Sequence, residues 1–95
     1  MIAFISPYDY MLDVAKRAKE LRLSQNLSRK TLAAKSGVSE PSIKRFESTG
    51  EIAFLSLLKI AHAMECQEDF TKIFSPRPII SLEDVLQKPR LRGRA

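Results

Sequence analysis

Apolar residues recur at helical spacing along much of the chain. Between Asp9 and Leu23 they occupy positions i, i+3, i+4, i+7 and i+10, and charged residues fill the other faces. A similar pattern runs from Phe54 to Met64, and a shorter one runs from Glu68 to Phe74. These stretches predict two packing helices and a further short helix. The residues predicted to face the core are Met11, Val14, Ala15, Ala18, Leu21, Phe54, Leu57, Leu58, Ala61, Met64, Phe70, Ile73 and Phe74.

Two shorter helices are predicted between residues 28 and 50. Ser28 is a candidate N-cap for a helix from Arg29 to Ser36, in which Leu32 faces inward. Gly37 ends this helix, because glycine adopts the left-handed conformation that other residues resist. Val38 is expected to fill the corner between the two helices.

The second of these helices begins after Ser39, another candidate N-cap. Glu40 and Pro41 fall in its first turn, where the missing N–H of proline costs little. Ile43 and Phe46 face the core together. The opposite surface is polar and basic, on a helix narrow enough to enter the major groove of DNA, and consists of Glu40, Pro41, Ser42, Lys44 and Arg45.

Together these residues resemble the core signature of the lambda-repressor-like helix-turn-helix family, also called the Xre family. The resemblance covers residues 15–66 and implies an all-α fold, a compact DNA-binding domain of four to five helices. Within that family, the run RFESTGEI followed by LLKIA resembles the antitoxins of HipB type, which partner HipA-like kinase toxins. The positions that carry the family resemblance are Leu27-Ser28, Leu32-Ala33, Gly37-Val38-Ser39, Ile43 and Glu47.

The resemblance also implies an ion pair between Arg22 and Glu47, which would tie the first helix to the recognition helix. The alternative is two independent surface charges, which would contribute little to stability. Three positions depart from the family pattern. Arg29 stands where the family commonly has glutamine, Thr49 where glycine is commoner, and Ala53 where a serine or similar cap is usual. The last two departures leave undecided whether the loop before Phe54 contacts phosphate.

Contacts with DNA can be divided by position along the motif. Main-chain amides at the two helix starts can bind phosphates, because helix N-termini carry unsatisfied donors. Glu40 could accept from a cytosine amino group, Ser42 could bond to several bases, and Lys44 and Arg45 could reach either guanine or phosphate. Arg29 either adds charge and reach or is merely solvated. The predicted DNA-binding residues are Ser28, Arg29, Ser39, Glu40, Ser42, Lys44 and Arg45.

Length and charge agree with a small DNA-binding domain. Ninety-five residues suit one domain with one core, and the net charge of +5 suits a polyanionic partner, although charge alone is weak support. Residues 28–50 carry five basic and two acidic side chains, residues 51–75 two and four, and residues 76–95 five and two. The predicted organisation is an N-terminal arm or strand (1–7), a helix-turn-helix domain (8–75) and a basic C-terminal tail (76–95).

Both ends of the chain leave alternatives open. Residues 1–5 are apolar without helical periodicity, and they form either a strand that pairs with a second copy or with the tail, or a dispensable disordered segment. Two prolines, at positions 76 and 78, stop the helical pattern before the tail. The last eight residues, with Arg90, Arg92 and Arg94, add non-specific DNA charge, dock on an acidic partner surface or keep the chain soluble.

The sequence predicts no catalytic, metal or cofactor site. His62 is isolated and is expected at the surface. Cys66 follows a packed helix and is interpreted as a small apolar filler, since no base is placed to activate it. The lone cysteine excludes an intramolecular disulfide. No stretch has the length of a membrane span or the pattern of a signal peptide, so a cytoplasmic protein is expected.

One helix-turn-helix unit touches only a few base pairs of double-stranded DNA. We therefore expect a symmetric homodimer on an inverted-repeat operator, with half-sites about one helical turn, ~34 Å, apart. The preferred interpretation is a transcriptional repressor that is also the antitoxin of a HipA-like kinase toxin and represses its own operon. One alternative is a free-standing or phage-type regulator without a toxin, another is a protein-interaction module that does not bind DNA, and an enzyme is a remote third.

Overall fold

The chain folds into a bundle of short helices. A computed structural model describes residues 4–78, and no strand occurs within that range. This architecture confirms the predicted all-α, lambda-repressor-like fold class. In order along the chain, the elements are α1 (Pro7–Ser24), α2 (Arg29–Ser36), α3 (Glu40–Thr49), α4 (Phe54–Ala63) and a 3-10 helix, η1 (Gln67–Lys72).

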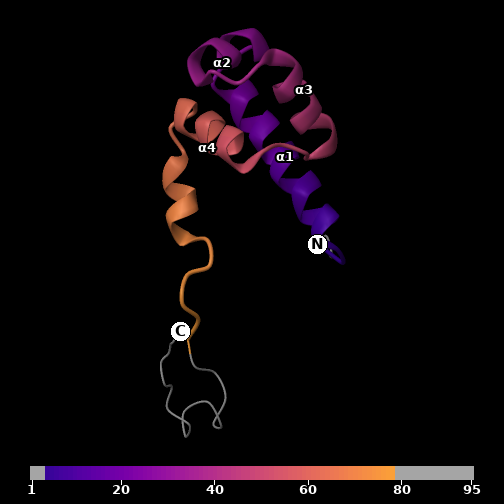
Figure 1. The fold of residues 1–95 in the computed structure, drawn as a ribbon, viewed down its shortest axis with the longest axis vertical. Coiled ribbons are helices and arrows are strands. Elements are labelled where there is room, and N and C mark those ends of the chain that lie inside the picture. The colour runs from indigo at the N-terminus through magenta and orange to yellow at the C-terminus, as the bar shows by residue number, and fades with distance from the viewer. Residues whose placement is uncertain (1–3, 79–95) are drawn as a thin grey trace, which may run out of the picture.

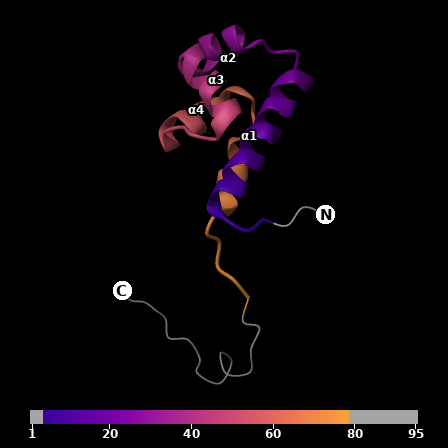
Figure 2. The same ribbon diagram turned by 90° about the vertical axis from the view of Figure 1, so that its right-hand side faces the viewer.

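The helices surround one small core. α3 packs against both α1 and α2, α4 packs against α2, and η1 packs against α4. α2 and α3 lie at one end of the molecule, and the chain beyond α4 runs toward the other end (Figure 1). Turned by 90°, α1 runs along one side while α2, α3 and α4 lie on the other (Figure 2). The buried core is formed by Ala15, Leu32, Val38, Ile43, Phe46, Ile60 and Met64.

α2 and α3 begin and end where local chemistry predicts. The Ser28 hydroxyl oxygen accepts the N–H of Thr31 at 3.0 Å, and the Ser39 hydroxyl oxygen accepts the N–H of Ser42 at 3.2 Å. Each bond satisfies one of the donors that a helix start leaves unpaired. Glycines end both helices in the left-handed conformation, with φ angles of 80° at residue 37 and 82° at residue 50.

α1 starts two residues earlier than the predicted Asp9. Ser6 is its N-cap and Pro7 its first residue. The Asp9 carboxylate accepts the backbone N–H groups of Ile5 at 2.8 Å and Ser6 at 3.0 Å, and these bonds lower its pKa. The sequence Ser-Pro-x-Asp is therefore a helix-start signal, with a reciprocal capping residue three positions after the cap.

The N-terminal arm is only partly within the described residues. Phe4 and Ile5 form no strand, and the ring of Phe4 lies edge-on to that of Tyr10 with centroids 4.7 Å apart. The remainder of the predicted arm, residues 1–3, lies outside the described residues, as do residues 79–95 of the predicted tail.

The predicted inner face of α4 is partly wrong. Phe54 is 62% exposed, whereas Ile60, which was not predicted to face the core, is 1% exposed. α4 is apolar on most of its faces, so its sequence alone does not determine which face turns toward the core. In the folded protein α4 packs against α2, and the residues that turn inward are Leu57, Ile60, Ala61 and Met64.

Two further expectations about packing are corrected. Val14 of α1 is 36% exposed, because Ala15 and Ala18 lie nearer the centre of the bundle. The predicted helix from Glu68 to Phe74 is instead the six-residue η1, which ends at Lys72. Phe74 follows it with a φ of 60° and is 93% exposed, so it does not belong to the apolar face of η1.

Candidate nucleic-acid interface

α3 carries a polar surface above a buried anchor. Ile43 and Phe46 are 1% and 2% exposed, and they hold the helix against the core. All four predicted base-reading side chains of this helix lie at the surface, and they are Glu40, Ser42, Lys44 and Arg45. Their placement permits contact with a duplex along the whole outer side of α3, and the contacts themselves stay predictions.

The hydroxyl groups of the two N-cap serines, Ser28 and Ser39, form hydrogen bonds within the chain, and each bonds to a neighbouring hydroxyl that can still donate. The Ser28 hydroxyl donates to Thr31 Oγ1 at 3.0 Å, and the Ser39 hydroxyl donates to Ser42 Oγ at 2.9 Å. Because Thr31 and Ser42 accept in these bonds, their own hydroxyl hydrogens can point outward to an acceptor on DNA. Thr31 was not among the predicted site residues. It follows Ser28 by three positions, the same spacing that separates Ser42 from Ser39.

Arg45 forms an ion pair with Glu51, a residue that was not predicted to belong to the site. Its Nε lies 3.1 Å from Glu51 Oε1, and its Nη2 contacts the same oxygen. The hydrogen bond and the charge of Glu51 raise the pKa of Arg45. Both side chains are more than half exposed, so DNA phosphate can compete with Glu51 for this guanidinium.

We expect Glu51→Gln to tighten DNA binding by roughly threefold to tenfold, because it removes a negative charge beside the interface and releases Arg45. The measurement is fluorescence anisotropy with a labelled duplex. Glu68→Gln is the matched control, since it removes the same charge from η1, which packs against α4. Equal effects of the two substitutions would contradict a local role for Glu51.

Glu47 of α3 lies between two arginines. Arg22 Nε lies 2.7 Å from Glu47 Oε2, and Arg22 Nη2 lies 3.1 Å from Glu47 Oε1. Arg29 Nε donates to the same Oε1 at 2.9 Å. The side chains of Arg22 and Glu47 are only 6% and 4% exposed, so the alternative of two independent surface charges is wrong.

This trio connects three helices and a loop. Arg22 belongs to α1, Arg29 to α2 and Glu47 to α3, and Arg22 Nη1 also donates to the carbonyl of Leu27 at 2.8 Å. Burial raises the pKa of Glu47, but the hydrogen bonds and charges of Arg22 and Arg29 outweigh burial and hold it below the ordinary value of 4.5. The carboxylate is therefore ionised at neutral pH.

The remaining candidate residues lie apart from this surface. His62 is exposed, and Cys66 is half-buried against the core, where burial and then the charge of Asp69 raise the pKa of its thiol. Residues 4–78 contain no cluster of metal-ligating side chains, and none of their helices has the length and apolar character of a membrane span. The predicted partner-binding residues Arg90, Arg92 and Arg94 lie outside the described residues.

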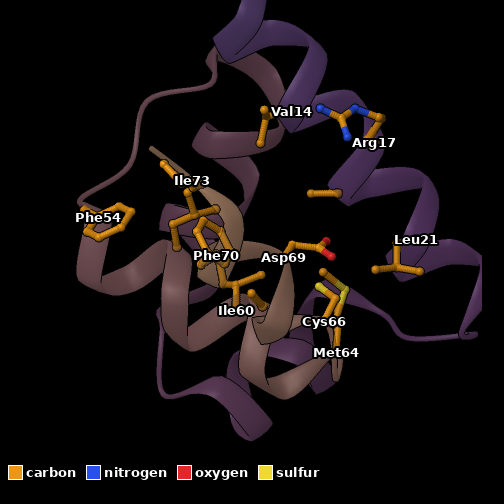
Figure 3. A pocket seen from close by; sticks show the side chains of 13 residues that line it. Val14, Arg17, Leu21, Phe54, Ile60, Met64, Cys66, Asp69, Phe70 and Ile73 are labelled. Carbon is orange, nitrogen blue, oxygen red and sulfur yellow. The ribbon is translucent and has the colours of Figure 1, made fainter. Parts of the chain in front are cut away.

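An apolar groove opens on the side formed by α1, α4 and η1 (Figure 3). It encloses about 550 Å³, and no residue of α2 or α3 lines it. Phe54 and Ile73 are 62% and 47% exposed at this groove, and the Phe54 ring lies edge-on to Phe70 with centroids 6.0 Å apart. A partner in this groove would leave the outer surfaces of α2 and α3 uncovered.

One comparison with known proteins identifies a related family. A family model described as helix-turn-helix matches residues 19–70, which is more than half of the chain. The match begins in the second half of α1 and extends through α2, α3, α4 and part of η1. No curated protein and no solved structure is significantly similar to the chain.

Proposed function

Because the chain belongs to the Xre-type helix-turn-helix family of DNA-binding transcription regulators, we propose that it is a repressor that binds an inverted-repeat operator as a symmetric homodimer. In this proposal α3 enters the major groove of each half-site, and the first turn of α2 lies against the backbone. Repression follows from occupying the operator in the cytoplasm and excluding other proteins from it.

The observation that carries the proposal is the composition of α3. Its inner residues are almost completely buried, so the helix has a fixed orientation, and its outer residues combine two cations with hydroxyl and carboxylate groups. Such a mixture supplies both the charge that binds phosphate and the donors and acceptors that distinguish bases. A surface used only to bind an apolar protein partner would not need this chemistry.

Lys44→Ala and Arg45→Ala are each expected to weaken operator binding about tenfold, without a change in melting temperature. Both side chains are exposed, so their removal leaves the core intact. Lys72→Ala removes an equivalent charge from η1 and serves as the control. A duplex selected from a random pool by the wild-type protein is a suitable probe.

Salt dependence separates this proposal from its principal alternative. If several phosphates are neutralised, affinity falls by orders of magnitude between about 50 and 200 mM salt. A flat response, or failure to shift any duplex at low salt, would favour a protein-interaction module that retains the helix-turn-helix scaffold without binding DNA.

The groove between α1, α4 and η1 supports association with a second copy. Binding two half-sites needs two recognition helices, and a dimer formed through this groove would leave both of them exposed. The rim residues Phe54 and Ile73 would lose contact with water on dimerisation, which is favourable for apolar side chains. The proposed occupant is therefore the same groove of another molecule.

Phe54→Asp should convert the dimer to a monomer at micromolar concentrations and weaken operator binding, because it places a charge in the apolar contact. The mass in solution is measured by light scattering or sedimentation. Leu23→Asp is the control, since Leu23 is 54% exposed on α1 but does not line the groove. A dimer that survives Phe54→Asp would place the contact elsewhere.

The antitoxin role is a finer proposal. Its support is the resemblance of residues 45–52 and 57–61 to antitoxins of HipB type, which partner HipA-like kinase toxins. The part of the chain proposed to engage a toxin is the basic end, residues 88–95. Deleting it should abolish co-purification with the kinase and leave operator binding intact. Loss of operator binding alone would indicate a free-standing regulator whose tail binds DNA.

A further inference from the structure

A glutamate on α3 restrains the orientation of Arg29 at the first position of α2. The restraint begins at the Leu27 carbonyl, which accepts from Arg22 Nη1 at 2.8 Å. Arg22 in turn holds both oxygens of Glu47, and Glu47 Oε1 accepts from Arg29 Nε at 2.9 Å. Every partner before Arg29 is buried or belongs to the backbone, so the position of the carboxylate is fixed by the fold.

Arg29 retains binding capacity after this contact. A guanidinium has five N–H donors, and the contact with Glu47 uses the single donor on Nε. The side chain of Arg29 is 33% exposed, whereas that of Glu47 is 4% exposed, so part of the Arg29 side chain remains open to solvent. Two guanidinium charges share one carboxylate, and the trio therefore retains a net positive charge.

We propose that Glu47 is a positioning residue for DNA binding, and that it holds Arg29 so that the two Nη groups meet one backbone phosphate beside the start of α2. This inference rests on the proposed DNA-binding function. An arginine whose torsions are already fixed loses less freedom when it binds than a solvated one does. The contact is therefore stronger than that of an unrestrained arginine at the same position.

A phosphate is favoured over a base because of the neighbouring backbone. Arg29 is the first residue of α2, and the N–H of Thr31 already bonds to Ser28. The N–H groups of Arg29 and Lys30 precede the first helical hydrogen bond, which runs from Leu32 to Ser28, and can bind an external oxygen. Two backbone donors beside a planar guanidinium suit the several oxygens of a phosphate.

A double-mutant cycle in DNA affinity tests the proposal. Glu47→Gln should weaken binding of the selected duplex about fivefold to tenfold in the wild-type background and have no further effect in an Arg29→Gln background. Arg29→Gln should reduce the slope of log affinity against log salt by about 1, because it removes one cation that neutralises a phosphate. The loss of melting temperature caused by Glu47→Gln should persist in both backgrounds, because Arg22 remains without its carboxylate.

If the effects of Glu47→Gln and Arg29→Gln on affinity were additive, the inference would be overturned, since Glu47 would then affect DNA binding independently of Arg29. A loss of affinity that depends on the identity of one base pair, with an unchanged salt slope, would indicate that Arg29 contacts a base and not a phosphate. Arg29→Lys supplies a second test if Glu47→Gln fails to fold, because it keeps the charge and the Arg22–Glu47 pair while removing the planar fork. Wild-type affinity in that variant would also overturn the inference, and failure of wild-type protein to bind any duplex would instead refute the proposed function.

Discussion

Arg22→Met is expected to lower the free energy of unfolding by about 3–5 kcal/mol, the cost of leaving one member of a buried ion pair without its principal partner. Arg22 makes two hydrogen bonds to Glu47 and one to the Leu27 carbonyl, and it is 5% exposed. Methionine preserves much of the side-chain volume, so the loss reports the polar contacts rather than a cavity. Denaturant unfolding at pH 7 measures the difference.

Two comparisons assign this loss to the charge of Glu47. Lys19→Met removes an exposed cation of the same helix that does not line the groove, and it should change stability by less than about 0.5 kcal/mol. The wild-type pKa of Glu47 lies below 4.5, so the stability from its ionisation is present above that pH and is lost as the pH falls through the folded-state pKa. Replacing Arg22 raises the pKa of Glu47, because burial then opposes ionisation with one arginine fewer.

The difference between wild type and Arg22→Met should therefore shrink on acidification. It should be largest near neutral pH and smallest below the folded-state pKa of Glu47 in the wild type, where Glu47 becomes protonated in both proteins. A difference that stayed constant over this range would assign the loss to packing or to the Leu27 carbonyl. It would also remove the premise that Glu47 is held in its charged form by the two arginines.

The sequence predicted the helix-turn-helix itself because its boundaries depend on local chemistry. A serine cap, a left-handed glycine and a second serine cap fall within residues 28–39, and each acts on the backbone of its own turn. The inward turn of Ile43 and Phe46 follows from spacing within one short helix. These features need no knowledge of distant parts of the chain, so they could be inferred before the fold.

The features that the sequence did not predict depend on contacts between elements. The orientation of α4 about its axis was ambiguous because Leu55, Leu58 and Ile60 are all apolar, and only packing against other elements shows which of them turns inward. The bond from Arg29 to Glu47 joins residues 18 positions apart. Its only possible sequence signal was the departure from glutamine at residue 29, which identified an unusual residue but not its partner.

Gly50 is a further position whose importance emerges only from the packing. It ends α3 with a φ of 82°, and an added Cβ would lie 2.9 Å from both Met11 Cβ and the Met11 carbonyl oxygen on α1. The carbonyl belongs to the helix backbone and cannot rotate away. Gly37 has a nearly identical φ of 80°, but a Cβ added there would have no neighbouring atom within 4 Å.

Gly50→Ala should accordingly lower the free energy of unfolding by about 3 kcal/mol or more, whereas Gly37→Ala should cost only about 1 kcal/mol. Both substitutions impose the same strain on a left-handed residue, so their difference isolates the close approach of α1 to the end of α3. Chemical unfolding of both variants measures it. Equal losses would mean that α1 moves away easily, and a mobile α1 would also weaken the buried contact between Arg22 and Glu47 on which the orientation of α3 depends.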